Sequence, residues 1–154
     1  MSPMWIVFAA LAVLAISQAD VTIKLEKYDN PADRLQDGTN CEPFGISKCD
    51  PYFILTVRNS FNTSLVSTYT STHTDDVSSV DFGSFIGFLN PVTAKVPNGT
   101  VVDITIVAMD DDPIGEHELI GTFNYFYVAG QTPKRESRVS GTSTVTVLFN
   151  TTRF

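Results

Sequence analysis

Hydrophobic and polar residues alternate with a period of two along most of this chain. The segments with this alternation, or with many β-branched and aromatic residues, are 21–28, 52–58, 65–69, 85–89, 101–109, 119–128 and 143–149. Such segments predict β-strands that bury one or both faces. Breaks rich in Pro, Gly, Asn and Asp separate them, and no segment after residue 20 has the 3.6-residue period of an amphipathic helix.

Seven or eight short strands without helices predict an all-β fold, an antiparallel β-sandwich. The polar stretch 70–84 is expected to form a long connection or a ragged strand. A length of 154 residues suits a single domain with one core. We find no internal repeat and no low-complexity tract.

The N-terminal segment has the features of a secretory signal peptide. An apolar run from about Met4 to Ile16 precedes Ser17-Gln18-Ala19, whose small residues fit a cleavage site before Asp20. The alternative, an uncleaved signal anchor, requires a longer apolar run. We therefore predict a secreted, extracellular protein with residues 1–19 as signal peptide and 20–154 as the folded domain.

Secretion affects how the cysteines and asparagines are interpreted. Cys41 and Cys49 are the two cysteines of the chain, and in an oxidising compartment we expect a local disulfide. The alternative, a reactive thiol pair, has no neighbouring base to activate it. Asn62, Asn98 and Asn150 begin N-glycosylation sequons and are expected on exposed loops or strand edges.

Charge limits the range of partners. The chain has 17 acidic and 10 basic residues and a formal net charge of −7. This balance argues against nucleic-acid binding, which needs a basic face. It also disfavours binding to anionic lipid unless a cation lies between the protein and the lipid.

The acidic residues are clustered in loops. Asp110-Asp111-Asp112 ends the most apolar predicted strand, and Glu118 follows nearby, whereas Asp37 and Asp50 flank the cysteine loop. Consecutive carboxylates repel one another unless they are solvated or share a cation. Calcium prefers six to eight such hard oxygen ligands. The alternative is a solvated acidic turn, since Asp-Pro is a turn former.

Two motifs resemble those of C2 domains. Residues 49–57, Cys-Asp-Pro-Tyr-Phe-Ile-Leu-Thr-Val, are similar to a Ser-Asp-Pro-Tyr-Val signature of that family. Residues 107–121 are similar to the family's calcium-binding loop 3, in which a strand ends in Asp-x-Asp, an acid follows six positions later and Ile-Gly closes the loop. The resemblance implies an eight-stranded C2-type β-sandwich that binds calcium.

The C2 resemblance also implies a set of ligands. Asp110, Asp112 and Glu118 would provide carboxylates from loop 3, with the Asp111 main-chain carbonyl as a further oxygen. Asp50 would provide a carboxylate from loop 1. Asp37 is the expected fifth, although the cysteine loop lengthens its separation from Asp50. Glu118 stands where aspartate is commoner in the family.

A narrower resemblance is to the N-terminal C2 domain of Notch ligands. Residues 28–41 and 49–53 are similar to its first strand and cysteine-bearing loop, but two further cysteines of that family are absent. No Delta/Serrate/Lag-2 module or EGF repeat follows within the sequence, and receptor engagement in that family depends largely on those modules. We therefore expect a lone secreted domain.

Apolar residues beside the predicted calcium site suggest contact with phospholipid membranes. Ile114 lies where C2 domains often carry a membrane-inserting side chain, and Phe44 and Ile46 lie between the two cysteines. The alternative is that Phe44 and Ile46 pack under their own loop. Two further groups of residues are expected to lie on the solvated surface. One is a basic cluster on a late loop, and the other is the pair of histidines. The residues of the two groups are, in order, Lys134, Arg135 and Arg138, and His73 and His117.

Three function classes can be compared. The first is a calcium-dependent C2 domain that binds phospholipid surfaces. The second is a calcium-independent interaction module for an extracellular receptor, such as one of Notch type, or for a matrix protein. An enzyme is not expected, because the sequence shows no pairing of a nucleophile with a base.

Overall fold

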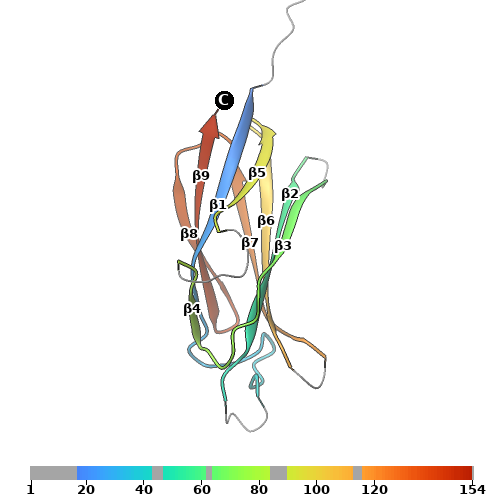
Figure 1. The fold of residues 1–154 in the computed structure, drawn as a ribbon, viewed down its shortest axis with the longest axis vertical. Coiled ribbons are helices and arrows are strands. Elements are labelled where there is room, and N and C mark those ends of the chain that lie inside the picture. The colour runs from blue at the N-terminus through green and yellow to red at the C-terminus, as the bar shows by residue number, and fades with distance from the viewer. Residues whose placement is uncertain (1–16, 43–46, 62–63, 84–89, 113–115, 154) are drawn as a thin grey trace, which may run out of the picture.

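The computed structural model describes residues 17–42, 47–61, 64–83, 90–112 and 116–153. Its described part contains no helices and nine strands in two antiparallel sheets that pack face to face (Figure 1). The strands are β1 (Gln18–Asp29), β2 (Pro51–Asn59), β3 (Leu65–Thr70), β4 (Ser79–Asp81), β5 (Val92–Pro97), β6 (Val101–Asp110), β7 (Glu118–Val128), β8 (Lys134–Ser140) and β9 (Ser143–Arg153). The predicted all-β sandwich is confirmed, with nine strands instead of eight.

Each sheet has a central strand pair that the alternating pattern makes apolar on its inner face. One sheet has the order β4-β1-β9-β8, with β5 also paired to β1, and the other has the order β3-β2-β6-β7. Buried side chains at every second position of the central strands fill the space between the sheets. They include Val21, Ile23 and Leu25 of β1, Phe53, Leu55 and Val57 of β2, Val102, Ile104 and Ile106 of β6, and Val145, Val147 and Phe149 of β9.

Strand β1 has two different neighbours along one of its edges. Its first half pairs with β5, from Gln18 opposite Pro97 to Ile23 opposite Val92, and its last three residues pair with β4. Asn90 occupies the interval: its side-chain oxygen accepts from the Leu25 main-chain nitrogen at 3.1 Å, and its amide donates to the Leu25 carbonyl at 2.8 Å. A side-chain amide thus continues the backbone ladder where the partner strand changes.

Two strands were not expected from the sequence, and a third was expected only as one of two alternatives. The third is β4, which has only three residues and lies in the stretch 70–84, expected to form a long connection or a ragged strand. β5 alternates between buried and exposed residues, but it is short, follows Pro91 directly and ends at Pro97. β8 has the sequence KRESRVS, which offers no apolar face, and the strand lies at a sheet edge. The predicted strand 85–89 lies outside the described residues.

The basic cluster expected on a late loop is on strand β8 instead. Arg135 forms a two-pronged ion pair with Glu26 of β1, with nitrogen–oxygen distances of 2.6 and 2.9 Å. Arg138 contacts Glu136 and lies 5.9 Å from the centre of the Tyr125 ring. The loop prediction was wrong because pairing with β9, and not local composition, defines this strand.

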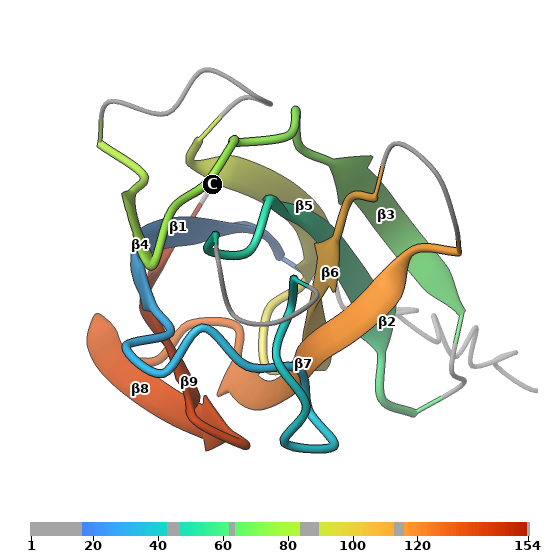
Figure 2. The ribbon, with the colours of Figure 1, turned by 90° about the horizontal axis from the view of Figure 1, so that it is seen from below.

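At one end of the sandwich, the connections between strands gather around a common centre. This loop end contains the described parts of 30–50, 71–78 and 111–117, together with the tight β8–β9 turn (Figures 1 and 2). Segments that are far apart in the sequence therefore meet there, including those with the predicted calcium ligands. Within the described residues, the chain has no helix with the length and apolar character needed to cross a bilayer.

The N-terminal end of β1 overlaps the predicted signal peptide. Gln18 and Ala19 pair with β5, and the Ala19 side chain is buried. Cleavage between Ala19 and Asp20 would shorten β1 by two residues and stays a prediction. Among the sequon asparagines, Asn98 and Asn150 are exposed, as glycosylation requires, and Asn62 lies outside the described residues.

Candidate metal site at the loop end

Asp110 is a buried carboxylate at the centre of the loop end. It is the last residue of β6 and continues the inward-facing series Val102, Ile104, Ile106 and Ala108, so its side chain has no solvent exposure. Its Oδ1 accepts a hydrogen bond from the Asp50 main-chain nitrogen at 2.6 Å. Its Oδ2 is buried and has no hydrogen-bond partner in the described residues.

The surroundings of Asp110 make its negative charge costly. Its pKa is raised from the ordinary 3.8 to about 6, mainly by burial and also by repulsion from the carboxylates of Asp112, Glu42 and Asp50, while the hydrogen bond from the Asp50 nitrogen lowers it. An unpaired oxygen of a buried carboxylate costs free energy unless a proton or a cation neutralises it. A proton or a cation at this oxygen would remove that cost.

Two more carboxylates converge on Asp110. One oxygen each from Glu42, Asp110 and Asp112 lie within 4.8 Å of one another. Burial raises the pKa of Glu42, and repulsion from Asp112, Asp50, Asp76 and Glu118 adds to the effect. Ligands of this kind are all hard oxygens, which calcium prefers over softer donors. The donor set therefore fits calcium.

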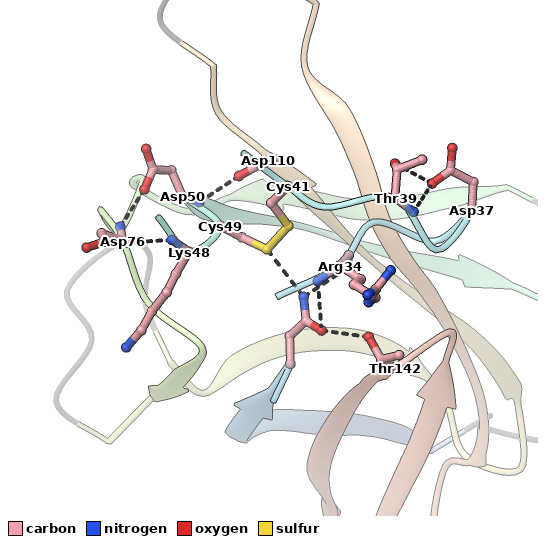
Figure 3. Close-up of a disulfide and its surroundings, with 11 residues drawn as sticks. Arg34, Asp37, Thr39, Cys41, Lys48, Cys49, Asp50, Asp76, Asp110 and Thr142 are labelled. Carbon is pink, nitrogen blue, oxygen red and sulfur yellow. Dashed lines mark hydrogen bonds between the residues drawn. A yellow bond between two sulfur atoms is a disulfide. The ribbon is translucent and has the colours of Figure 1, made fainter. Parts of the chain in front are cut away.

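Asp50 is held in place by backbone contacts on both sides. Its carbonyl accepts from the Asp111 nitrogen at 3.1 Å, which extends the pairing of β2 with β6 by one step. Its carboxylate accepts from the main-chain nitrogen of Asp76, a residue with φ of 53°. Asp76 in turn accepts from the Lys48 nitrogen at 2.6 Å (Figure 3). Loops 30–50 and 71–78 are thereby joined at the rim of the site.

Asp37 lies apart from the other predicted ligands. Its carboxylate accepts hydrogen bonds from the Thr39 nitrogen at 2.8 Å and the Thr39 hydroxyl at 2.6 Å, which lower its pKa. Figure 3 shows it on the opposite side of the disulfide from Asp50 and Asp76. It also lines a surface pocket with Leu35, Gln36, Glu118 and Leu119. In this arrangement Asp37 is not among the carboxylates that meet at Asp110.

Asp111 directs its side chain away from this group, to the two histidines. His73 Nδ1 contacts Asp111 Oδ2, and His117 Nδ1 lies 2.9 Å from Asp111 Oδ1. The C2 resemblance implies the Asp111 main-chain carbonyl as a calcium ligand, and a side chain engaged elsewhere is compatible with that role. The histidines were expected as solvated surface residues, and this shared contact was not predicted.

Comparison with known proteins identifies the fold. No protein-family model matches the sequence, and no curated protein matches it significantly. A C2 domain protein from Ramazzottius varieornatus is 14% identical with a TM-score of 0.65, and the match covers 88% of this chain and 89% of that one. A Drosophila C2-DSL-EGF1 structure is 16% identical with a TM-score of 0.62, covering 86% of this chain and 67% of that one. The chain has the C2 fold.

The Drosophila structure supports the narrower resemblance to the C2 domain of Notch ligands at the level of the fold. Human GIVD cytosolic phospholipase A2 is also similar, with 14% identity and a TM-score of 0.60 over 88% of this chain. This chain spans only 17% of the phospholipase, and the match lies in that protein's C2 domain. The similarity therefore carries no catalytic activity over to this C2 domain, and the absence of enzyme activity stays a prediction.

Two acidic residues at the loop end of this C2 domain were missed from the sequence. Glu42 follows Cys41 directly, and the disulfide carries it to the Cys49-Asp50 segment. The expected pairing of the cysteines was the feature of the sequence that could have indicated this position of Glu42. Asp76 lies in a polar connection without a motif, and only the fold brings it to Asp50. The predicted membrane-contact residues Phe44, Ile46 and Ile114 lie outside the described residues.

The predicted disulfide between Cys41 and Cys49 is confirmed. It is buried beneath the acidic group, with sulfur atoms close to the Asp110 carboxylate, and its Cys49 sulfur lies 3.3 Å from the Asn30 amide. Asn30 also donates to the Arg34 carbonyl and accepts from the Thr142 hydroxyl. The bridge thus joins the β1–β2 loop to the β8–β9 turn through one buried asparagine.

Removing the disulfide is expected to weaken both the fold and the acidic site. Replacing Cys41 and Cys49 together with serine should lower the free energy of unfolding by about 2–3 kcal/mol, because the bridge closes a short loop between cysteines eight positions apart. Urea denaturation of both proteins measures this change. Wild-type protein in reducing agent is the matched control and should move to the same midpoint. An unchanged midpoint in both would contradict the prediction.

Proposed function

We propose that this protein is an extracellular C2 domain that binds calcium at its loop end and, with calcium bound, attaches to phospholipid membrane surfaces. The main support is the buried Asp110 carboxylate, whose unpartnered oxygen lies among those of Glu42 and Asp112. A divalent cation would neutralise the repulsion among these groups and complete the coordination of the orphaned oxygen.

Individual residues have distinct roles in this proposal. Asp110, Asp112 and Glu42 provide carboxylate oxygens, and the Asp50 carboxylate lies at the same rim. Glu118 is paired with Asp110 in the register of β6 and β7, and its charge reaches Glu42. The Asp111 carbonyl adds a main-chain oxygen. Asp37 can join these ligands only if the loop containing Thr39 rearranges, so we assign it the smallest contribution to calcium binding.

The membrane step follows from charge. A protein with net charge −7 is repelled by anionic lipid, and calcium at the loop end reverses the local field there. A partly coordinated ion can then bind lipid phosphates, while Phe44, Ile46 and Ile114 are the apolar side chains proposed to enter the interface. The similarity in fold to a C2 domain of a phospholipase is compatible with this role.

Thermal denaturation with and without calcium tests the first half of the proposal. An ion at 100 times its dissociation constant adds about 2.7 kcal/mol, which for a domain of this size raises the melting temperature by about 5–11 °C. The purified protein should melt higher in millimolar calcium than in chelator, and magnesium should have a smaller effect. No shift with calcium at several millimolar would overturn the proposal.

Vesicle sedimentation tests the second half. With calcium present, the protein should sediment with vesicles of phosphatidylserine and phosphatidylcholine, and chelator should release it. Replacing Ile114 with serine should weaken sedimentation while leaving the calcium-induced rise in melting temperature unchanged. A calcium response without vesicle binding would refute the membrane step. It would then favour the alternative, a protein partner such as a Notch-type receptor or a matrix protein.

A further inference from the structure

Strand β3 lies at the open edge of its sheet. The sheet has the order β3-β2-β6-β7, and within the described residues only β2 pairs with β3 (Figures 1 and 2). The Ser71 nitrogen donates to the Phe53 carbonyl at 2.8 Å, and hydrogen-bonded and non-hydrogen-bonded pairs alternate along an antiparallel ladder. Thr68 and Thr70 occupy the non-hydrogen-bonded positions, so their main-chain N–H and C=O groups point away from β2.

The other edge strands of the described sandwich are protected from pairing with a further strand. β8 is mostly charged, β4 has three residues, and β5 ends at Pro97. The edge of β7 is occupied at two points. Its Leu119 carbonyl accepts from the Gln36 nitrogen at 2.9 Å, and its Thr122 nitrogen donates to the Ser140 hydroxyl at 3.1 Å. Charge, proline, short length and cover by other segments are the usual means of blocking a sheet edge.

β3 has neither charge nor proline to block its edge. No Asp, Glu, Lys or Arg occurs between Arg58 and Asp75, and the strand has the sequence Leu-Val-Ser-Thr-Tyr-Thr. Valine, threonine and tyrosine favour strand formation. Leu65, the first residue of β3, is 59% exposed, and Phe61, just after β2, is 78% exposed. An uncharged edge with exposed apolar side chains beside it favours the addition of another strand.

A second copy of this chain is the partner that the charges favour. The net charge of −7 makes two copies repel one another over most of their surface, so they can approach only where charged residues are absent. The open edge of β3 is such a place. Association about a two-fold axis brings the same strand of each copy together. With the axis near Thr68, the two copies of this residue lie beside each other, and threonine pairs across strands are favourable.

We propose that the open edge of β3 is a self-association surface, at which two copies of this chain pair through antiparallel β3 strands. The pairing joins two four-stranded sheets into one continuous sheet. Because the two strands run in opposite directions, the two loop ends also point in opposite directions, and the dimer presents its acidic groups to two separate surfaces. Only a role for these groups in membrane attachment rests on the proposed function, because the association itself needs no calcium.

Sedimentation equilibrium in chelator tests the association. Protein made without N-glycans is suitable, because the Asn62 sequon lies between β2 and β3. A ladder of six residues is a small interface, so we expect a dissociation constant of about 10–1000 μM. The mean mass should rise from one chain toward two as the protein concentration increases to about 1 mM. Over the same range, amide hydrogen exchange at Thr68 and Thr70 should become slower.

Charged variants of Thr68 identify the surface. This residue is exposed, and Thr68→Lys or Thr68→Glu places like charges beside each other in the dimer. Each variant should therefore weaken association by about tenfold. A mixture of the two variants should associate more strongly than either alone, because the facing charges are then opposite. Thr93→Lys is the matched control. It adds the same charge to an exposed threonine of β5, in the other sheet, and should associate as wild type does.

Three results would each overturn the proposal, with melting curves to check that every variant is folded. The first is a single monomeric species at about 1 mM protein. The second is hydrogen exchange at Thr68 and Thr70 that does not depend on protein concentration. The third is a mixture of the lysine and glutamate variants that associates no more strongly than its components.

Discussion

Asp110→Asn is expected to stabilise the calcium-free protein at pH 7 by about 2–3 kcal/mol and to abolish its response to calcium. The stabilisation follows from the raised pKa, about 6 in the folded protein against the ordinary 3.8, since each pKa unit corresponds to about 1.4 kcal/mol. Asparagine keeps an oxygen for the Asp50 nitrogen. It also places an amide donor among the remaining carboxylates.

The effect of this substitution should depend on pH in a defined direction. The folded protein holds the Asp110 proton more tightly than the unfolded chain, so this carboxyl favours folding below about pH 4. That contribution is lost as the pH rises through 6. The stability difference between variant and wild type should therefore be small at pH 4 and largest above pH 6. Taking the difference cancels the titration of acids that do not interact with Asp110.

Urea denaturation in chelator across this pH range measures the effect, and melting curves with calcium measure the lost response. Asp103→Asn is a matched control, because Asp103 lies on the same strand away from the loop end, in contact with Ser60. It should leave the calcium response intact. If Asp110→Asn instead destabilised the calcium-free protein by more than 1 kcal/mol at pH 7, the charge of Asp110 would be favourably paired, contrary to the structure.

Phe53→Ala is expected to cause the largest loss of stability, about 3–5 kcal/mol. Phe53 is fully buried and makes edge-to-face contacts with Tyr28 at 5.1 Å and with Phe82 at 4.9 Å. This aromatic cluster lies in the core beneath the loop end, and its removal leaves a cavity that rigid sheets cannot close. Loss of this packing should also lower calcium affinity, because Asp50 begins the segment that contains Phe53.

The matched control is Phe126→Ala, which removes the same side chain from a position 61% exposed on β7. Its effect on the free energy of unfolding should stay within about 0.5 kcal/mol. Equal urea midpoints for the two alanine variants would show that the aromatic cluster contributes little to the core.

The sequence predicted the fold class because strong alternation marks the buried strands. β2 and β6 are apolar enough to be recognised without their partners, and both contain a motif of the C2 resemblance. β8 could not be recognised in this way, because it exists through hydrogen bonds to β9 and its residues are mostly charged. Short edge strands depend on neighbours that sequence periodicity does not reveal.

The candidate site could be predicted only where ligands lie in a motif. Asp110 and Asp112 could be predicted as ligands because they belong to the motif at the end of β6. Asp50 could be predicted because it belongs to the motif at the start of β2. Glu42 needed the disulfide to bring it into range, and the local hydrogen bonds of Asp37 with Thr39 place it elsewhere. The link of Asp111 to both histidines depends on three loops meeting, which no local pattern predicts.

The pairing of β1 with β9 has a consequence for how the protein is made. β1 is the first described strand to leave the ribosome, and β9, its long central partner, is the last. Until β9 emerges, only β4 and β5 can pair with β1, both along the same edge, and the first sheet stays incomplete. Contacts between such distant segments slow folding, typically to milliseconds or seconds. The first sheet therefore stays incomplete while the intervening strands are made, and strand edges exposed during that interval are prone to aggregation.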